Sequence, residues 1–195
     1  MILKEDGTLW TWECSLEACA SVLNQIRTSP PVRFRELEDV AKFNGDYDNG
    51  IALKKDGTVW IWGYAMLAKP KEEKWPKYEI PFQLTGFSDI TDISYNNAHI
   101  LALKKDGTVW AMGYFLKSGG SVAIYDKENF QPLHQVEGIT DVAKVIASEK
   151  TYAAIKNDGS FWMWGSDLNG LFGIIYGGDG AIQERPVQVA LKPIE

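Results

Sequence analysis

The chain has 195 residues, of which 45% are hydrophobic and 24% are charged, and its formal net charge is −6. This balance is that of a globular chain with a substantial core. The Lys and Arg residues are scattered, so the basic patch of a nucleic-acid-binding protein is missing. No apolar run approaches the roughly 18 residues of a membrane helix, and the N-terminus lacks the regions of a signal peptide. We expect no nucleic-acid or membrane partner, and the compartment stays unknown.

The first predicted element is a hairpin within LKEDGTLWTWE, residues 3–13. Its Asp6-Gly7 pair separates two apolar runs, and an Asp-Gly pair is a strong signal for a tight β-turn because both residues tolerate a positive φ. Similar strings follow as LKKDGTVWIWGY at 53–64, LKKDGTVWAMGY at 103–114 and IKNDGSFWMWGS at 155–166. The sequence therefore predicts one repeat domain over residues 1–195, with repeat turns at 6–7, 56–57, 106–107 and 158–159.

An amphipathic helix is predicted after the first hairpin, in SLEACASVLNQIR. Leu16, Cys19, Leu23 and Ile26 recur at helical spacing, and Ser15 is a suitable N-cap. We expect this helix to pack on the first hairpin, with docking of a partner as the alternative. Cys14 and Cys19 would lie too far apart on a helix for an unstrained disulfide, so free thiols are expected.

Each repeat also contains a proline that opens a short β-like stretch, as in PFQLTGF from residue 81 and PLHQVEGI from residue 132. Runs such as DITDISY and HILALKK lie between the proline and the next Asp-Gly turn. Each unit therefore has four short predicted strands. The strand Val59-Trp60-Ile61-Trp62 is apolar at every position, which requires cover on both faces. Small antiparallel sheets stacked face to face, as blades of a β-propeller, supply that cover.

These motifs resemble the repeat of the regulator of chromosome condensation family. The residues concerned are Leu-Lys-Lys-Asp-Gly-Thr-Val-Trp-Ala-x-Gly, the proline-led strand, and NNAHILAL with His99. The resemblance covers essentially the whole chain and implies a propeller of blades about fifty residues long, in a bacterial-type protein. Some relatives are nucleotide-exchange factors for small GTPases and some inhibit enzymes, but their functional loops cannot be matched to this sequence. Well-known members close with seven blades.

Counting strands shows that a closing blade would be short. Joining the two ends supplies 14 residues between the anchors, where the unit from Pro81 to Asp106 has 24. The ten that are lacking correspond to ITDISYNNAH, about one strand. The expected fold is thus all-β: a propeller-like array of about four four-stranded blades, possibly incomplete or open. Three interpretations remain: part of a longer chain, a small ring with one defective blade, or a half-ring completed by self-association.

The loops that follow the repeated Trp strands differ most between units, and binding sites on repeat scaffolds concentrate in such loops. They contain KPKEEKWPKYE and FGIIYGGDGAIQE, which combine aromatic residues with charges or glycines. Aromatic side chains are enriched in binding hot spots. The candidate partner-binding residues are Trp75, Tyr78, Tyr125, Phe172 and Tyr176, with packing of each loop on its own blade as the alternative.

Catalytic chemistry has little support in the sequence. His99 and His134 are the only histidines and occupy different repeat positions, and His99 is expected to be structural. The repeated Asp residues lie on successive turns, which separates them. No P-loop or calcium-loop spacing is present, so no cofactor, metal or catalytic residue is assigned. The predicted function is a non-enzymatic scaffold that binds a protein partner through its variable loops. The alternatives are a structural part of a larger ring or oligomer, and an exchange factor or inhibitor acting on a partner enzyme.

Overall fold

The computed structural model describes residues 1–11, 30–45, 49–64, 77–96, 99–114, 130–148, 151–166 and 182–189. This part of the chain forms four antiparallel sheets. Sheet I contains β1 (Ile2–Leu3), β2 (Leu9–Thr11) and β3 (Val32–Phe34), and sheet II contains β4 (Val40–Gly45), β5 (Asn49–Lys54), β6 (Val59–Tyr64) and β7 (Lys77–Gln83). Sheet III contains β8 (Ile90–Asn96), β9 (His99–Lys104), β10 (Val109–Tyr114) and β11 (Phe130–Gln135), and sheet IV contains β12 (Val142–Ala147), β13 (Thr151–Lys156), β14 (Phe161–Ser166) and β15 (Ile182–Val189).

The Asp-Gly pairs form the predicted hairpin turns. Gly57 has a φ of 82°, which is open to glycine without strain, and its N–H donates to the Lys54 carbonyl at 2.9 Å. The turns at Gly7, Gly107 and Gly159 repeat this geometry. The strands that flank each turn pair directly, as Leu53 with Val59 and Leu103 with Val109. The hairpin prediction is therefore confirmed in all four repeats.

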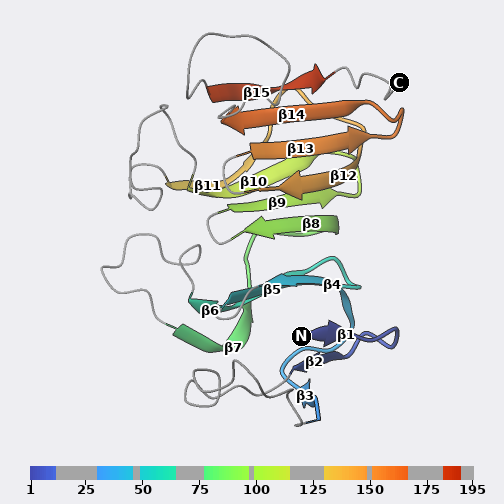
Figure 1. The fold of residues 1–195 in the computed structure, drawn as a ribbon, viewed down its shortest axis with the longest axis vertical. Coiled ribbons are helices and arrows are strands. Elements are labelled where there is room, and N and C mark those ends of the chain that lie inside the picture. Colours follow the sequence, from blue (N-terminus) through green and yellow to red (C-terminus); the bar gives the residue numbers. More distant parts are fainter. Residues whose placement is uncertain are drawn as a thin grey trace, which may run out of the picture.

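The four sheets follow one another along the long axis of the molecule, from sheet I at the bottom of Figure 1 to sheet IV at the top. We call the side of a sheet that is directed toward the next sheet in chain order its forward face, and the opposite side its back face. In sheet II, Ile51 and Ile61 of the forward face pack into the core shared with sheet III, while Ala52 and Trp62 of the back face pack against sheet I. Both faces of a central strand are thus buried, as its uninterrupted apolar sequence predicts.

Three hydrophobic cores join the four sheets in the described part of the chain. The first includes Leu9 and Val40, the second Ile93 and Ile100, and the third Leu101 and Val145. None of these cores joins sheet IV to sheet I, which lie at opposite ends of the stack in Figure 1. The structure is therefore an open array of propeller-type sheets and not a closed ring of four.

Sheet I has three strands where the other sheets have four. Its β1, β2 and β3 correspond to β5, β6 and β7 of sheet II, so the missing strand corresponds to β4, β8 and β12. The segment ITDISYNNAH, identified by counting, contains β8. The prediction of about four blades with one strand lacking is confirmed. The predicted helix and both cysteines lie outside the described residues and stay predictions.

Candidate interaction surface

The antiparallel topology gives the array two different edges. The Asp-Gly turns and the connections between successive sheets lie at one edge, which we call the turn edge. Figure 1 shows two of these hairpins, β1–β2 and β13–β14, on the same side of the stack. The strands β2, β6, β10 and β14 end at the other edge and the strands β3, β7, β11 and β15 start there, so the four segments that differ most in sequence all leave from it. We call this the variable edge.

At the turn edge the repeated Asp anchors a short chain of polar contacts. In the second repeat the Asp56 Oδ1 accepts hydrogen bonds from the Thr58 amide at 3.0 Å and from the Thr58 hydroxyl at 2.6 Å. The Thr58 Oγ1 in turn accepts from the Trp60 Nε1 at 3.0 Å, and the Lys54 ammonium lies 5.6 Å from the Trp60 ring centroid. The other three repeats reproduce the arrangement, with Ser160 in place of Thr in the fourth. The contacts orient the Trp ring.

These hydrogen bonds keep the turn carboxylates ionised. Donation by the Thr58 side chain, followed by its backbone amide, lowers the pKa of Asp56. The same cause lowers the pKa of Asp6, Asp106 and Asp158. A carboxylate held in its anionic form is an acceptor and not a proton donor at neutral pH. One oxygen of each carboxylate is bound within its own turn, in agreement with the sequence-based interpretation of these residues as turn residues.

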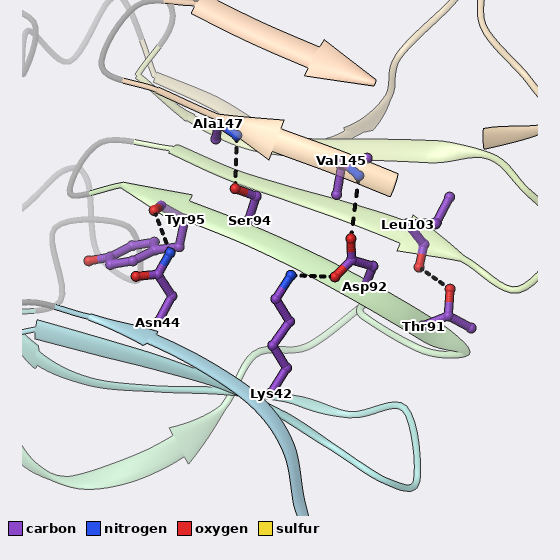
Figure 2. Close-up of polar contacts among 9 residues, drawn as sticks. All are labelled: Lys42, Asn44, Thr91, Asp92, Ser94, Tyr95, Leu103, Val145 and Ala147. Atoms are coloured by element: carbon purple, nitrogen blue, oxygen red, sulfur yellow. Dashed lines mark hydrogen bonds and ion pairs between the residues drawn. The ribbon is translucent and has the colours of Figure 1, made fainter. Parts of the chain in front are cut away.

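The innermost strands β4, β8 and β12 connect neighbouring sheets through polar contacts, which Figure 2 shows. The Lys42 ammonium of β4 lies 2.5 Å from the Asp92 Oδ1 of β8, and the other oxygen of Asp92 accepts from the Val145 amide of β12 at 3.3 Å. Two positions further along, the Asn44 side chain donates to the Tyr95 carbonyl at 3.2 Å, and the Ser94 hydroxyl accepts from the Ala147 amide at 2.8 Å. The strands β4 and β8 thus each use two alternate side chains to bind the next innermost strand.

Sequence reasoning missed these contacts. Lys42, Asp92 and Lys144 occupy the same repeat position, as do Asn44 and Ser94, so polar residues in a fixed phase of the repeat were the available signal. Their role depends on which strand is innermost, and only the three-dimensional arrangement shows that.

His99 lies at the variable edge, where β9 begins, and is only 2% exposed. Its amide donates to the Asn96 Oδ1 at 3.0 Å, its Nδ1 lies 3.0 Å from the same oxygen, and its ring stands edge-on to Tyr152 at 5.2 Å. The Asn96 side chain also donates to the Ser148 carbonyl of sheet IV. Burial raises the pKa of the Tyr152 phenol. This buried group ties sheet III to sheet IV directly beneath the variable edge.

The predicted partner-binding residues lie in or next to the segments that leave from the variable edge. Tyr78 is placed by its backbone on β7, paired with Gly63 at the variable edge, and its side chain is not described. Trp75, Tyr125, Phe172 and Tyr176 lie outside the described residues, so their role stays a prediction. The structure describes the places where these segments leave and rejoin the sheets, which are the ends of β6, β10 and β14 and the starts of β7, β11 and β15.

Among the described residues, no three His, Cys, Asp or Glu side chains gather in a way that could hold a metal ion. The Nδ1 of His134, on β11, lies 2.9 Å from the Pro132 carbonyl. The described part also contains no helix with the length and hydropathy needed to cross a membrane.

Small antiparallel sheets that stack face to face, with the innermost strand of each sheet in contact with that of the next, define a protein of the β-propeller class. Solved structures identify the type of propeller. Human WBSCR16 is similar with a TM-score of 0.67 and 19% identity over 99% of this chain. Yeast RCC1 (Prp20), solved with Kap60, gives 0.67 and 19% over 97%, and Prp20p from Saccharomyces cerevisiae, in a study of its binding to Gsp1p and histones, gives 0.63 and 18% over 84%.

The chain therefore has the fold of the RCC1-type propellers, as the repeat motifs predict. It spans about half the length of those solved chains, namely 51%, 46% and 41% in the order given. No family model matches the sequence. No curated protein matches it either.

Proposed function

We propose that this chain is a non-enzymatic repeat domain that binds another protein through the variable edge. One observation carries the proposal: the antiparallel topology places the strand ends that flank the four segments of most divergent sequence at the same edge. The opposite edge is occupied by near-identical Asp-Gly turns whose side chains are engaged in their own scaffold contacts.

Two solved structures of this fold support a protein partner. The structure of Prp20p was solved together with a study of its binding to Gsp1p and histones, and yeast RCC1 was solved in complex with Kap60. The likeness reaches the fold only, so no partner is transferred by name. A negatively charged chain such as this one, at −6, is suited to a partner surface that is neutral or basic.

The test exchanges the loops and leaves the scaffold unchanged. In one variant residues 65–76, 115–129 and 167–181 are replaced by Gly-Ser segments of equal length. In the control, Lys55 and Lys105 of the exposed turns are changed to Glu. Partners cross-linked to the wild-type chain in cells are identified by mass spectrometry and purified, and their dissociation constants are then measured directly. The proposal predicts a loss of at least tenfold in affinity for the loop variant alone; equal binding by wild type and loop variant, both folded by circular dichroism, contradicts it.

A structural role in a larger ring or oligomer is the second candidate, because no core of the described residues joins sheet IV to sheet I. Ile155, Phe161 and Met163 on the forward face of sheet IV are half-buried, whereas Leu53, Val59 and Ile61 at the equivalent positions of sheet II are buried. Light scattering that finds a monomer at all accessible concentrations would contradict self-association. Exchange activity toward a candidate GTPase is tested by nucleotide release, which this protein would leave unchanged if it is only a scaffold.

A further inference from the structure

The position of the missing innermost strand in sheet I is bounded by two described strands. On one side lies β1, which pairs with β2 and has no second neighbour among the described strands. On the other side lies β4, the innermost strand of sheet II. We call this position the strand gap. Sheets II, III and IV show what fills the equivalent position, so the chain itself provides the template for an occupant.

The first part of the template is the backbone of β4. On β4, Phe43 pairs with Ala52 and Gly45 pairs with Gly50. At the equivalent positions of β12, Val145 pairs with Ala154 and Ala147 pairs with Tyr152. In β12 the amides of Val145 and Ala147 donate to Asp92 and Ser94 of the preceding innermost strand. For Phe43 and Gly45 the described part of the chain contains no such preceding strand. An occupant with an acceptor side chain at each of these two positions would reproduce both hydrogen bonds.

The second part of the template is the positive charge of Lys42 on β4. Lys42 and Asp92 occupy the same position on successive innermost strands and lie 2.5 Å apart, so residues at this position reach one another. A carboxylate at the same position of an occupant would therefore approach Lys42 from its other side. The Lys42 side chain is 40% exposed, which leaves room for a second acceptor. The occupant is thus expected to carry Asp or Glu here.

The third part of the template is the exposed apolar surface at Met1 and Ile2. Met1 and Ile2 are 41% and 45% exposed, whereas Ile51 and Ala52, their counterparts beside β4, are fully buried. A strand paired with residues 1–4 would shield the edge of β1 and complete a four-stranded sheet.

From these three observations we propose that the strand gap is a β-strand addition site for an extended segment of a partner protein. The segment carries a carboxylate and a hydroxyl two residues apart, with a β-branched apolar residue between them, as in Asp92-Ile93-Ser94. Among the described strands of this chain only β8 has that pattern, and it is already engaged in sheet III, so a second copy is a poor occupant. The site is separate from the variable edge, and its failure would leave the proposed function standing.

The probe is a blocked synthetic peptide with the sequence of residues 87–97, FSDITDISYNN. It is titrated into the isotopically labelled full chain, and amide chemical shifts and hydrogen exchange are recorded by NMR. The expected result is saturable binding with a dissociation constant on the order of 0.1–1 mM, with shifts centred on residues 1–4 and 42–45.

Matched variants test the proposed recognition. A peptide with Asp92→Lys is expected to bind at least tenfold more weakly. Its control, with Asp89→Lys and therefore the same net charge, should bind like the parent, because the contacts from β8 to the next innermost strand are made by Asp92 and Ser94 and not by Asp89. On the protein, Lys42→Glu is expected to weaken binding at least tenfold, and Lys144→Glu, at the same position of the innermost strand of sheet IV, should have no effect.

Several outcomes would overturn the proposal. These are the absence of binding at about 2 mM peptide, shifts confined to β12–β15, and equal binding by wild type and a folded Lys42→Glu variant. Concentration-dependent shifts at Phe43 and Gly45 without peptide would also overturn it, because they would assign the strand gap to a second copy of the chain.

Discussion

Glycine at each of the first three repeat turns provides a point where one sheet contacts the next. The carbonyls of Gly7, Gly57 and Gly107 accept from the amides of Val40, Ile90 and Val142, which begin the next innermost strands. A Cβ at Gly107 would lie 3.1 Å from the Asp141 Cα, whereas at Gly159, in the last sheet, it would meet nothing within 4 Å. Both glycines have a φ of 82°, so they differ in crowding and not in backbone conformation.

This pair allows crowding to be separated from backbone strain. Gly159→Ala is expected to cost about 1 kcal/mol through its left-handed conformation alone. Gly107→Ala should cost at least about 1 kcal/mol more, because the backbone of Asp141 must move away. Urea unfolding of the two variants measures the difference. Equal destabilisation would show that the contact between the turn and the next sheet contributes little.

The turn carboxylates make stability depend on acid pH. Their pKa values are lowered in the folded chain, so their contribution is present above the unfolded pKa near 4 and is lost as the pH falls through the folded values. Replacing Asp6, Asp56, Asp106 and Asp158 together by Asn should lower the melting temperature at pH 7 and reduce its decrease between pH 4 and pH 2. Thermal melts across this pH range provide the test. An unchanged decrease in melting temperature between pH 4 and pH 2 would contradict the role given to the turn carboxylates.

At the scale of the strand, the innermost position depends on side chains that bridge sheets. Asp92 accepts from both Lys42 and the amide of Val145, and its side chain is 16% exposed, compared with 40% for Lys42. The ion pair is partly screened by solvent, while the Val145 amide belongs to a residue in the core. Asp92 therefore has the larger role in the contact.

Asp92→Ala is accordingly expected to cost about 1–3 kcal/mol because it leaves the Val145 amide without this acceptor. Lys42→Ala should cost less than about 1 kcal/mol. A double-mutant cycle read by chemical denaturation gives the coupling between the two residues. A Lys42 effect as large as that of Asp92 would mean that the ion pair, and not the amide contact, joins sheets II and III.

The hairpins could be predicted from sequence because an Asp-Gly turn between apolar runs is specified locally. The missing strand could be predicted because the repeat has a fixed length. The bridging roles of Lys42, Asp92 and Ser94 could not, since they arise from contacts about fifty residues apart between strands whose order in the sheet was unknown. The structural role expected for His99 agrees with its burial and its contacts with Asn96 and Tyr152. The proposed binding aromatics in the variable segments stay a prediction.

At the scale of the whole molecule, stability should fall toward the sheet I end of the open array. Among the described residues, sheets II and III are covered on both faces, whereas sheet I is covered on its forward face only and has three strands. In a repeat array each sheet is stabilised by its immediate neighbours, so each of the two central sheets is stabilised by two stacking interfaces.

Amides of β1–β3 are therefore expected to exchange with solvent at least about tenfold faster than those of β5 and β9, a difference of roughly 1.4 kcal/mol in opening free energy. Hydrogen exchange followed by mass spectrometry measures it. Uniform protection across the four sheets would indicate a single cooperative unit and would contradict this gradient.

The contacts between sheets also bear on how such a gene can change in length. Each hydrogen bond between a repeat turn and the next innermost strand involves only two consecutive repeats. Each hydrophobic core likewise joins the forward face of one sheet to the back face of the next. Inserting or deleting one fifty-residue unit in the middle of the array would therefore regenerate the same contact at the new junction. The near identity of residues 53–64 and 103–114 is the pattern that such a duplication leaves. Changes in blade number are thus compatible with folding, while the sequence of each variable segment can diverge independently.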